Sequence, residues 1–183
     1  KLSLSDSQSK ILRYGNPTGS LSKYVEGELI GNIYGYTTIG IAKTDEEMQQ
    51  HLASLPNGGQ SALGSQWAAG DIMYADLNGD HIVDGNDKSV AGYATRPEYV
   101  FGMNMGFDWK GFNFTMQWVG SKNVNRMYDI EYRIPYTNAG KRGLLTYFYD
   151  GCWTPENQLG AVYPRPSEES ESWNSEPSTL WLV

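Results

Sequence analysis

Cysteine is almost absent from this sequence, with Cys152 the only one among 183 residues. A single cysteine excludes an internal disulfide, so cysteine usage does not reveal the redox compartment. Cys152 has no partner cysteine for a zinc site, and the two histidines, His51 and His81, do not form a zinc-binding constellation. We therefore expect Cys152 to be a small, semi-buried apolar side chain.

Positive charge and long apolar runs are also scarce. The 14 Lys and Arg residues are outnumbered by 21 Asp and Glu residues, and the formal net charge is −7 without any basic stripe. Nucleic acid is therefore not an expected partner. No run of about 18 apolar residues exists, which excludes a transmembrane helix. The opening KLSLSDSQSK lacks Met and an apolar signal region, and STLWLV stops inside an apolar segment, so we expect both ends to be cut.

Aromatic residues and glycine are what the sequence has in quantity. Aromatics make up 13% of the residues, including 13 Tyr and 6 Trp, beside 21 Gly. This composition favours β structure with turns over a helical bundle. Residues 31–42, GNIYGYTTIGIA, are typical of a strand or an extended loop. The predicted fold class is therefore all-β.

One segment, residues 43–55 (KTDEEMQQHLASL), predicts a short helix of about three turns. Thr44 is the expected N-cap, and Glu47 three residues later completes a capping box. Met48, Leu52 and Leu55 repeat on one face. The following Pro56-Asn57-Gly58-Gly59 ends the helix.

Residues 99–120 (YVFGMNMGFDWKGFNFTMQWVG) predict a hairpin of two long antiparallel strands joined at Lys110-Gly111. Alternate positions place large apolar side chains on one face: Phe101, Met103, Met105, Phe107, Trp109, Phe112, Phe114, Met116 and Trp118. The opposite face carries small or polar residues: Val100, Gly102, Asn104, Gly106, Asp108, Asn113, Thr115, Gln117 and Val119.

Two architectures suit this alternation. A soluble β-sandwich turns the apolar face to its core and usually carries Lys, Glu and Arg on the other. A face of Gly, Asn, Thr and Gln is instead typical of the lumen of an outer-membrane barrel, whose strands of about ten residues point apolar side chains to the lipid. Such barrels carry aromatic girdles at both interfaces, and Trp109 and Phe112, flanking the tight Lys-Gly turn, match the short periplasmic turn of such a barrel. The pattern alone leaves both architectures open.

The segment YADLNGDHIVDGND (residues 74–87) has the spacing of a calcium loop. Counted from Asp76, the oxygen donors fall at positions 1, 3, 5, 7, 9 and 12, which are Asp76, Asn78, Asp80, the carbonyl of Ile82, Asp84 and Asp87. Asp at position 12 is typical of dockerin-type loops, and His81 departs from the usual Gly at position 6. The spacing predicts structural Ca²⁺; the alternative is an Asx-rich turn without metal.

Candidate catalytic chemistry is thin, and we expect the chain not to be an enzyme. The paired carboxylates Glu46/Glu47 and Glu168/Glu169 fall in a helix start and a polar loop, where they are solvated. The sequence contains no nucleophile motif and no phosphate-binding loop. The aromatic cluster Tyr147, Phe148, Tyr149 and Trp153 can stack on sugars or anchor a core.

The order of motifs resembles a known family. EGELIGNIYGYTTIGIAKTDEEM is followed by GDIMYADLNGDHIVDGNDKSVAGYATRPEYVFGMNMGFDWKGFNFTMQWVGSKNVNRMYD, then by WTPEN, YPRP and STLWLV. In this order they resemble SusC/RagA-type TonB-dependent outer-membrane transporters. The resemblance implies that residues 1–183 are a partial C-terminal barrel domain with long extracellular loops, whose plug domain and final strands are absent.

The resemblance also implies partners and a location. It predicts uptake of glycans or oligopeptides across the outer membrane of a Gram-negative bacterium, with a SusD-type surface lipoprotein as a lid. Energy would come from the TonB system through N-terminal regions missing here, and lipid would surround the barrel. The rival hypothesis is a soluble secreted β-domain with a dockerin-like calcium loop that binds glycan or protein. A glycan-processing enzyme is a third, for which no acid/base pair can be named.

Overall fold

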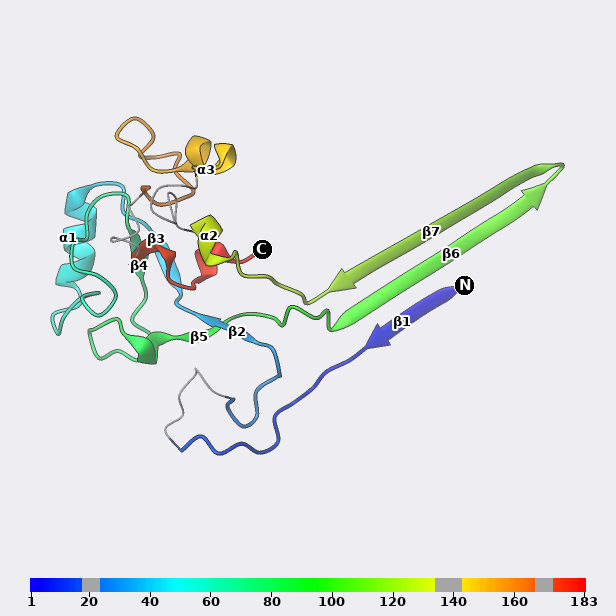
Figure 1. Ribbon diagram of the computed structural model, residues 1–183, viewed down its shortest axis with the longest axis horizontal. Helices are drawn as coiled ribbons and strands as arrows, with labels where there is room; N and C mark the ends of the chain where they lie inside the picture. The colour runs from blue at the N-terminus through cyan, green and yellow to red at the C-terminus, as the bar shows by residue number, and fades with distance from the viewer. Residues whose placement is uncertain (18–23, 134–142, 167–172) are drawn as a thin grey trace. The chain divides into compact units, whose positions relative to one another are not determined.

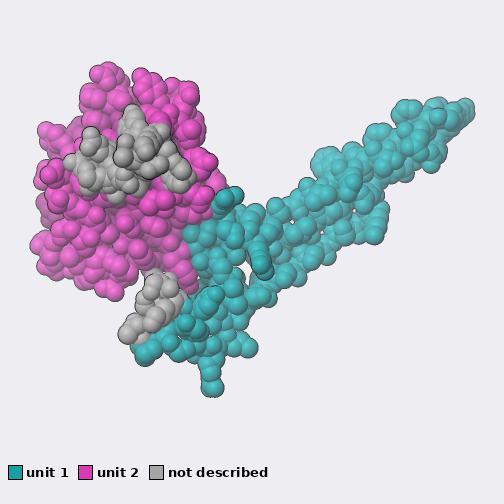
Figure 2. Space-filling view, in the orientation of Figure 1, with its two compact units in different colours: residues 1–33, 92–126 teal, residues 34–91, 127–183 magenta. Residues whose placement is uncertain are grey.

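The computed structural model describes residues 1–17, 24–133, 143–166 and 173–183 (Figure 1). Residues 1–33 and 92–126 form one compact unit, and residues 34–91 and 127–183 form a second (Figure 2). Strand residues outnumber helical ones in the described part, as expected for an all-β chain. No helix among these residues is long and apolar enough to cross a bilayer.

Unit 1 contains a three-stranded antiparallel sheet in the order β1-β6-β7, with β1 at Leu2–Asp6, β6 at Tyr99–Trp109 and β7 at Phe112–Lys122. The predicted hairpin is confirmed, since β6 and β7 pair along their full length from Tyr99↔Lys122 to Trp109↔Phe112. Lys110 and Gly111 both have positive φ, at 47° and 85°. Two positive φ values make the type I′ turn that matches the twist of paired strands.

The register places the side chains as the alternation predicts. Residues directly opposite in an antiparallel pair share a face, and Met103↔Trp118, Met105↔Met116 and Phe107↔Phe114 are such pairs. Strand β1, whose role in this sheet the sequence pattern did not reveal, adds two more apolar side chains to the same face through Leu2↔Met103 and Leu4↔Phe101.

The described strands form open sheets and not a closed barrel. The sheet β1-β6-β7 and the two-stranded sheets β2-β5 and β3-β4 are the sheets of the described residues, and none of them closes on itself. Strand β2 spans Ile33–Gly35 and β5 spans Ser89–Gly92. Closure into a transmembrane barrel therefore stays a prediction.

Unit 2 is built around the antiparallel pair β3 (Thr38–Ile41) and β4 (Ile72–Tyr74) and the helix α1 (Asp45–Ala53). The helix confirms the predicted segment: Thr44 accepts a hydrogen bond from the Glu47 backbone N–H at 3.3 Å, and Met48 is fully buried. The predicted capping box is formed only in part, because the Glu47 carboxylate accepts the backbone N–H of Lys43 and not that of Thr44. The main core of unit 2 consists of Tyr36, Ala42, Met48, Leu55, Trp67, Ile72, Met73, Tyr74, Val83 and Trp173.

A second, smaller core in unit 2 is aromatic. It involves α3 (Thr146–Gly151) and the 3₁₀ helix η3 (Thr179–Trp181). The remaining helix, α2, spans Ile130–Arg133. Phe148, Tyr163 and Trp181 stack nearly parallel, with ring centroids 5.1–6.2 Å apart. Cys152 is buried beside them, which agrees with the expected small apolar role.

Candidate functional site

The acidic loop lies between β4 and β5 in unit 2, with the 3₁₀ helix η1 (Gly85–Asp87) near its end. Its tight turn comes from two left-handed residues, Gly79 (φ 77°) and His81 (φ 66°). His81 therefore takes the conformation for which glycine is usual at that position, and histidine tolerates it better than most residues.

The first half of the loop is held by its own side chains. The Asp76 carboxylate accepts backbone N–H groups from Gly79 at 2.7 Å and from His81 at 2.9 Å. Asp80 accepts the backbone N–H of Ile82 and the side-chain amide of Asn78. Partial desolvation raises the pKa of Asp76, but the backbone donors outweigh it and the net pKa is lowered.

The second half is anchored by a buried carboxylate. Asp87 is fully buried and accepts backbone N–H groups from Leu77 at 2.8 Å and from Asp84 at 2.8 Å. Asp84 in turn caps η1 by accepting the N–H of Asn86. Asp87 thus joins the two ends of the loop, which is a structural role that needs no ion.

These contacts bear on the fit to calcium. The four carboxylates of the loop all accept hydrogen bonds from N–H groups within the loop; they belong to Asp76, Asp80, Asp84 and Asp87. In the part of the chain that the structure describes, no three acidic, His or Cys side chains are grouped so that they could hold a metal. The donors therefore do not converge in this conformation, and the calcium site with Asn78 and the carbonyl of Ile82 stays a prediction.

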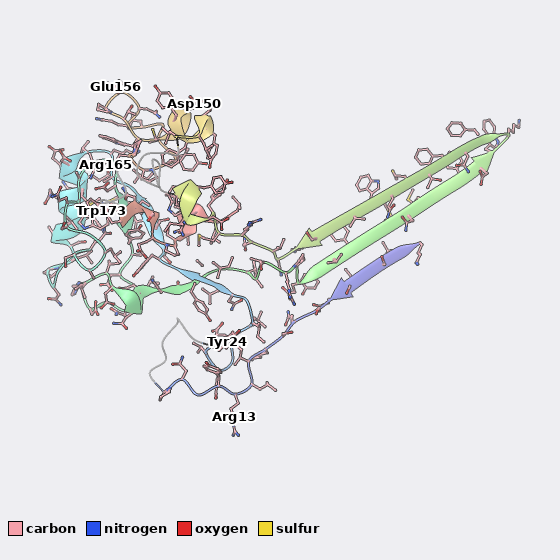
Figure 3. All side chains as sticks on the ribbon, viewed as in Figure 1. Arg13, Tyr24, Asp150, Glu156, Arg165 and Trp173 are labelled. Carbon is pink, nitrogen blue, oxygen red and sulfur yellow. The ribbon has the colours of Figure 1, made fainter. Side chains whose placement is uncertain are left out.

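The apolar face of the β1-β6-β7 sheet is the most distinctive surface of unit 1. Phe101, Met105, Phe107, Trp109, Phe112 and Trp118 are between 44% and 63% exposed. Ring side chains stand along one side of the hairpin in Figure 3. Phe107 stacks on Phe114 with centroids 5.3 Å apart, and Lys110 lies over the Trp109 ring at the turn. Large apolar side chains that are exposed together on one face mark a binding or membrane surface.

The opposite face has a different chemistry. Its register pairs are Asn104↔Gln117, Gly106↔Thr115 and Asp108↔Asn113. The Asn113 side-chain amide donates to the Asp108 carboxylate beside the turn. Asp108 is the one charged side chain in these pairs, and its carboxylate is hydrogen-bonded. The face is mostly small or polar, but it also exposes Val100 and Val119, at 42% and 70%.

A polar cluster ties the three strands together at the end away from the turn. Glu98 accepts side-chain amide donors from Asn123 and Gln8, and its carbonyl accepts the N–H of Ser7 at 3.0 Å. The hydrogen bonds from Asn123 and then Gln8 lower the pKa of the Glu98 carboxyl. Sequence patterns did not reveal this cluster, because Gln8 lies 90 residues from Glu98.

The predicted aromatic cluster of unit 2 is divided by the fold. Phe148 is buried in the ring stack, whereas Tyr149 is 67% exposed. Trp153 donates to the carbonyl of Lys43 and packs close to Gly70, so it is an anchor and not a free platform. Of the paired carboxylates, Glu47 serves the helix cap, and Glu168/Glu169 lie outside the described residues.

Comparison with known proteins gives relatives of one kind. No family model matches the chain. "TonB-dependent receptor P26" of Formosa agariphila is 28% identical over 151 residues, covering 81% of this chain and 14% of that protein. "TonB-dependent receptor P39" of the same organism is 28% identical, covering 57% and 12%. "TonB-dependent receptor P3", also from that organism, is 25% identical, covering 77% and 16%.

The chain thus spans only 12–16% of the length of these relatives. The sequence similarity is low, but it extends over much of the chain, and it supports a relationship to TonB-dependent receptors.

Proposed function

We propose that this chain contributes strands and loops to the barrel of an outer-membrane nutrient transporter of the TonB-dependent class, of the SusC/RagA type. The carrying observation is the exposed apolar face of the β1-β6-β7 sheet. TonB-dependent receptors are outer-membrane transporters and not enzymes, so the relatives support the same broad role.

The dimensions of the sheet agree with this role. Strands β6 and β7 have 11 residues each. At about 3.4 Å per residue, such a strand is about 37 Å long, and at a tilt of about 45° it crosses about 26 Å. The apolar band of outer-membrane barrels is about 25 Å tall. The aromatic rings of Trp109 and Phe112 then lie at one interface, with Lys110 beyond them.

The same register supports an orientation. Asp6, Tyr99 and Lys122 form one end of the sheet, and the Lys110-Gly111 turn forms the other. Residues 7–98 connect β1 to β6, and residues 123–183 follow β7, so both long segments leave from the same end. Barrels of this kind have short periplasmic turns and long extracellular loops. We therefore place both long segments, with the acidic loop, outside the cell.

The finer assignments rest on the motif order of the sequence. They are a SusD-type lipoprotein as the partner at the surface, coupling to the TonB system, and glycans or oligopeptides as substrates. Structural Ca²⁺ in the acidic loop belongs to the same proposal. It requires Asp76 and Asp80 to exchange their backbone N–H partners for the ion.

Two neighbouring positions test the membrane placement. Single cysteines at Met105→Cys and Asn104→Cys in the intact gene product, each in a Cys152→Ala background, are spin-labelled after reconstitution into lipid. The label at position 105 should collide with oxygen more than with a water-soluble nickel complex, and the label at 104 should show the reverse. A label at 105 shielded from both reagents would instead support the soluble sandwich, whose apolar face is packed in a core.

Orientation has its own test. A membrane-impermeant maleimide applied to whole cells should label Leu77→Cys, in the exposed acidic loop, and should not label Lys110→Cys until the cells are opened. The buried Cys152 of the parent protein serves as the unlabelled background. Labelling of Lys110→Cys alone on intact cells would reverse the proposed orientation.

A further inference from the structure

Unit 1 contains a cleft of about 510 Å³ next to the polar end of the β1-β6-β7 sheet. Its walls come from residues 7–9, 29–32 and 93–98, together with Asn123, all within unit 1. Small-molecule sites have volumes of about 300–1,000 Å³, so the cleft is large enough for a ligand of that class. Glu98 directly precedes β6 and Asn123 directly follows β7, which places the cleft where the long segments leave the sheet.

One wall of the cleft is organised before any ligand arrives. The Glu98 carboxylate is fixed by side-chain amides of Gln8 and Asn123, and these three residues come from three different strand ends. The same hydrogen bonds favour the ionised carboxylate, so its remaining lone pairs stay available as acceptors at neutral pH. A polar wall fixed in this way loses little conformational freedom when it binds a ligand.

The other wall offers groups with unused capacity. Arg96 is exposed and has no hydrogen bond or ion pair with the residues that the structure describes. The Tyr93 side chain is 51% exposed, and only its backbone N–H is committed, to the Asn125 side chain. Asn32 uses its amide N–H on Glu28 and keeps its carbonyl oxygen. Guanidinium donors, an aromatic face and amide acceptors thus line a single cleft.

The charge of the lining narrows the ligand class. Arg96 and Glu98 are the only charged side chains among the described lining residues, and their charges cancel. An anion approaching Arg96 also meets the Glu98 carboxylate, and a cation approaching Glu98 meets Arg96. A polyol avoids both conflicts, because each hydroxyl both donates and accepts, and the apolar side of a pyranose ring covers an aromatic face.

We propose that this cleft binds a neutral sugar unit of the imported substrate at the outer mouth of the transporter. The inference rests on the proposed function and names the substrate class and the residues at one site. Glu98, Gln8 and Asn123 supply acceptors and donors on one wall. Arg96 donates from the other, and the Tyr93 ring provides the stacking face.

Calorimetry on the intact gene product in detergent tests this site. The probes are maltohexaose, cellohexaose and laminarihexaose as neutral glycans, trigalacturonate as an anionic one, and tetra-alanine as a peptide. The variants Arg96→Ala and Tyr93→Ala remove the two groups with unused capacity. Arg13→Ala and Tyr24→Ala are matched controls, because both residues lie in unit 1 outside the cleft lining and Tyr24 is equally 51% exposed (Figure 3).

At least one neutral glycan should bind, and each cleft variant should weaken its Kd roughly tenfold or more, as expected for a lost bond to a charged donor or a lost stacking face. Both controls should stay within about twofold of the parent protein. The site is wrong if no neutral glycan binds, or if the cleft variants bind like the controls. Binding of tetra-alanine or trigalacturonate alone, lost in the cleft variants, also overturns it. The spin-label experiment above does not depend on any of these results, so failure of the site and failure of the transporter proposal are distinguishable.

Discussion

Replacing Gln60 by methionine should open the edge of strand β4 in unit 2. Gln60 is fully buried, and its side-chain amide takes the place of a neighbouring strand. Its Nε2 donates to the carbonyl of Ile72 at 3.1 Å, and its Oε1 accepts the backbone N–H of Tyr74 at 2.5 Å. The other edge of β4 is already paired with β3. Methionine fills a similar volume but offers neither a donor nor an effective acceptor.

The magnitude follows from the two backbone groups that lose their partners. Ile72 and Tyr74 are fully buried, so water does not replace the amide. Each buried group left without a partner costs about 1–3 kcal/mol. The sum is about 2–6 kcal/mol, and the easier burial of a thioether offsets part of it, so we expect a net loss of about 2–4 kcal/mol.

Hydrogen exchange measured by mass spectrometry on the intact gene product reads this loss locally. A loss of about 2–4 kcal/mol corresponds to exchange about 30- to 1,000-fold faster in peptides that cover β4. The matched control is Gln50→Met, because Gln50 is exposed on α1 and the two residues have similar helix propensities. The control should stay within about 0.5 kcal/mol of the parent. Equal protection of β4 in both variants would refute the role of Gln60.

Three further outcomes are expected. Arg165→Met should destabilise unit 2 by about 3–5 kcal/mol in thermal unfolding, because the fully buried Asp71 carboxylate loses its ion pair with the Arg165 guanidinium (Nε to Oδ1, 2.6 Å). The double variant Arg165→Met/Asp71→Asn should recover part of this loss, and strictly additive effects of the two substitutions would contradict the pairing. Because the pKa of Glu98 is lowered in the folded state, its carboxylate stabilises unit 1 above the ordinary glutamate pKa of 4.5, and this stabilisation is lost as the pH falls through the lowered folded pKa. Glu98→Gln should remove this part of the pH dependence of the melting temperature, and the same pH dependence in variant and parent would contradict the role of Glu98. Calcium titration calorimetry should show heat with the parent and none with Asp80→Ala, whereas silence in both would favour the turn without metal.

Local signals in the sequence determined the parts of this chain that are regular over a short range. The alternation with a period of two determines which side chains of residues 99–120 share a face. A two-residue turn then allows only one register between the two strands. The hairpin and both of its faces are therefore as predicted. The helix at Asp45–Ala53 follows from its cap and its apolar spacing in the same way. Motif order and the spacing of the acidic loop come from the sequence as well.

Contacts between distant residues decided the rest. The burial of Gln60 at the edge of β4 and the pairing of Asp71 with Arg165, 94 residues away, leave no mark on local periodicity. The same holds for Phe148, which enters a ring stack with Trp181 while its neighbour Tyr149 faces solvent. Propensity and alternation act over a few residues, whereas partners for buried polar groups are chosen only when the chain folds back on itself. The tertiary structure therefore determined which polar residues hold unit 2 together and where unit 1 has its cleft.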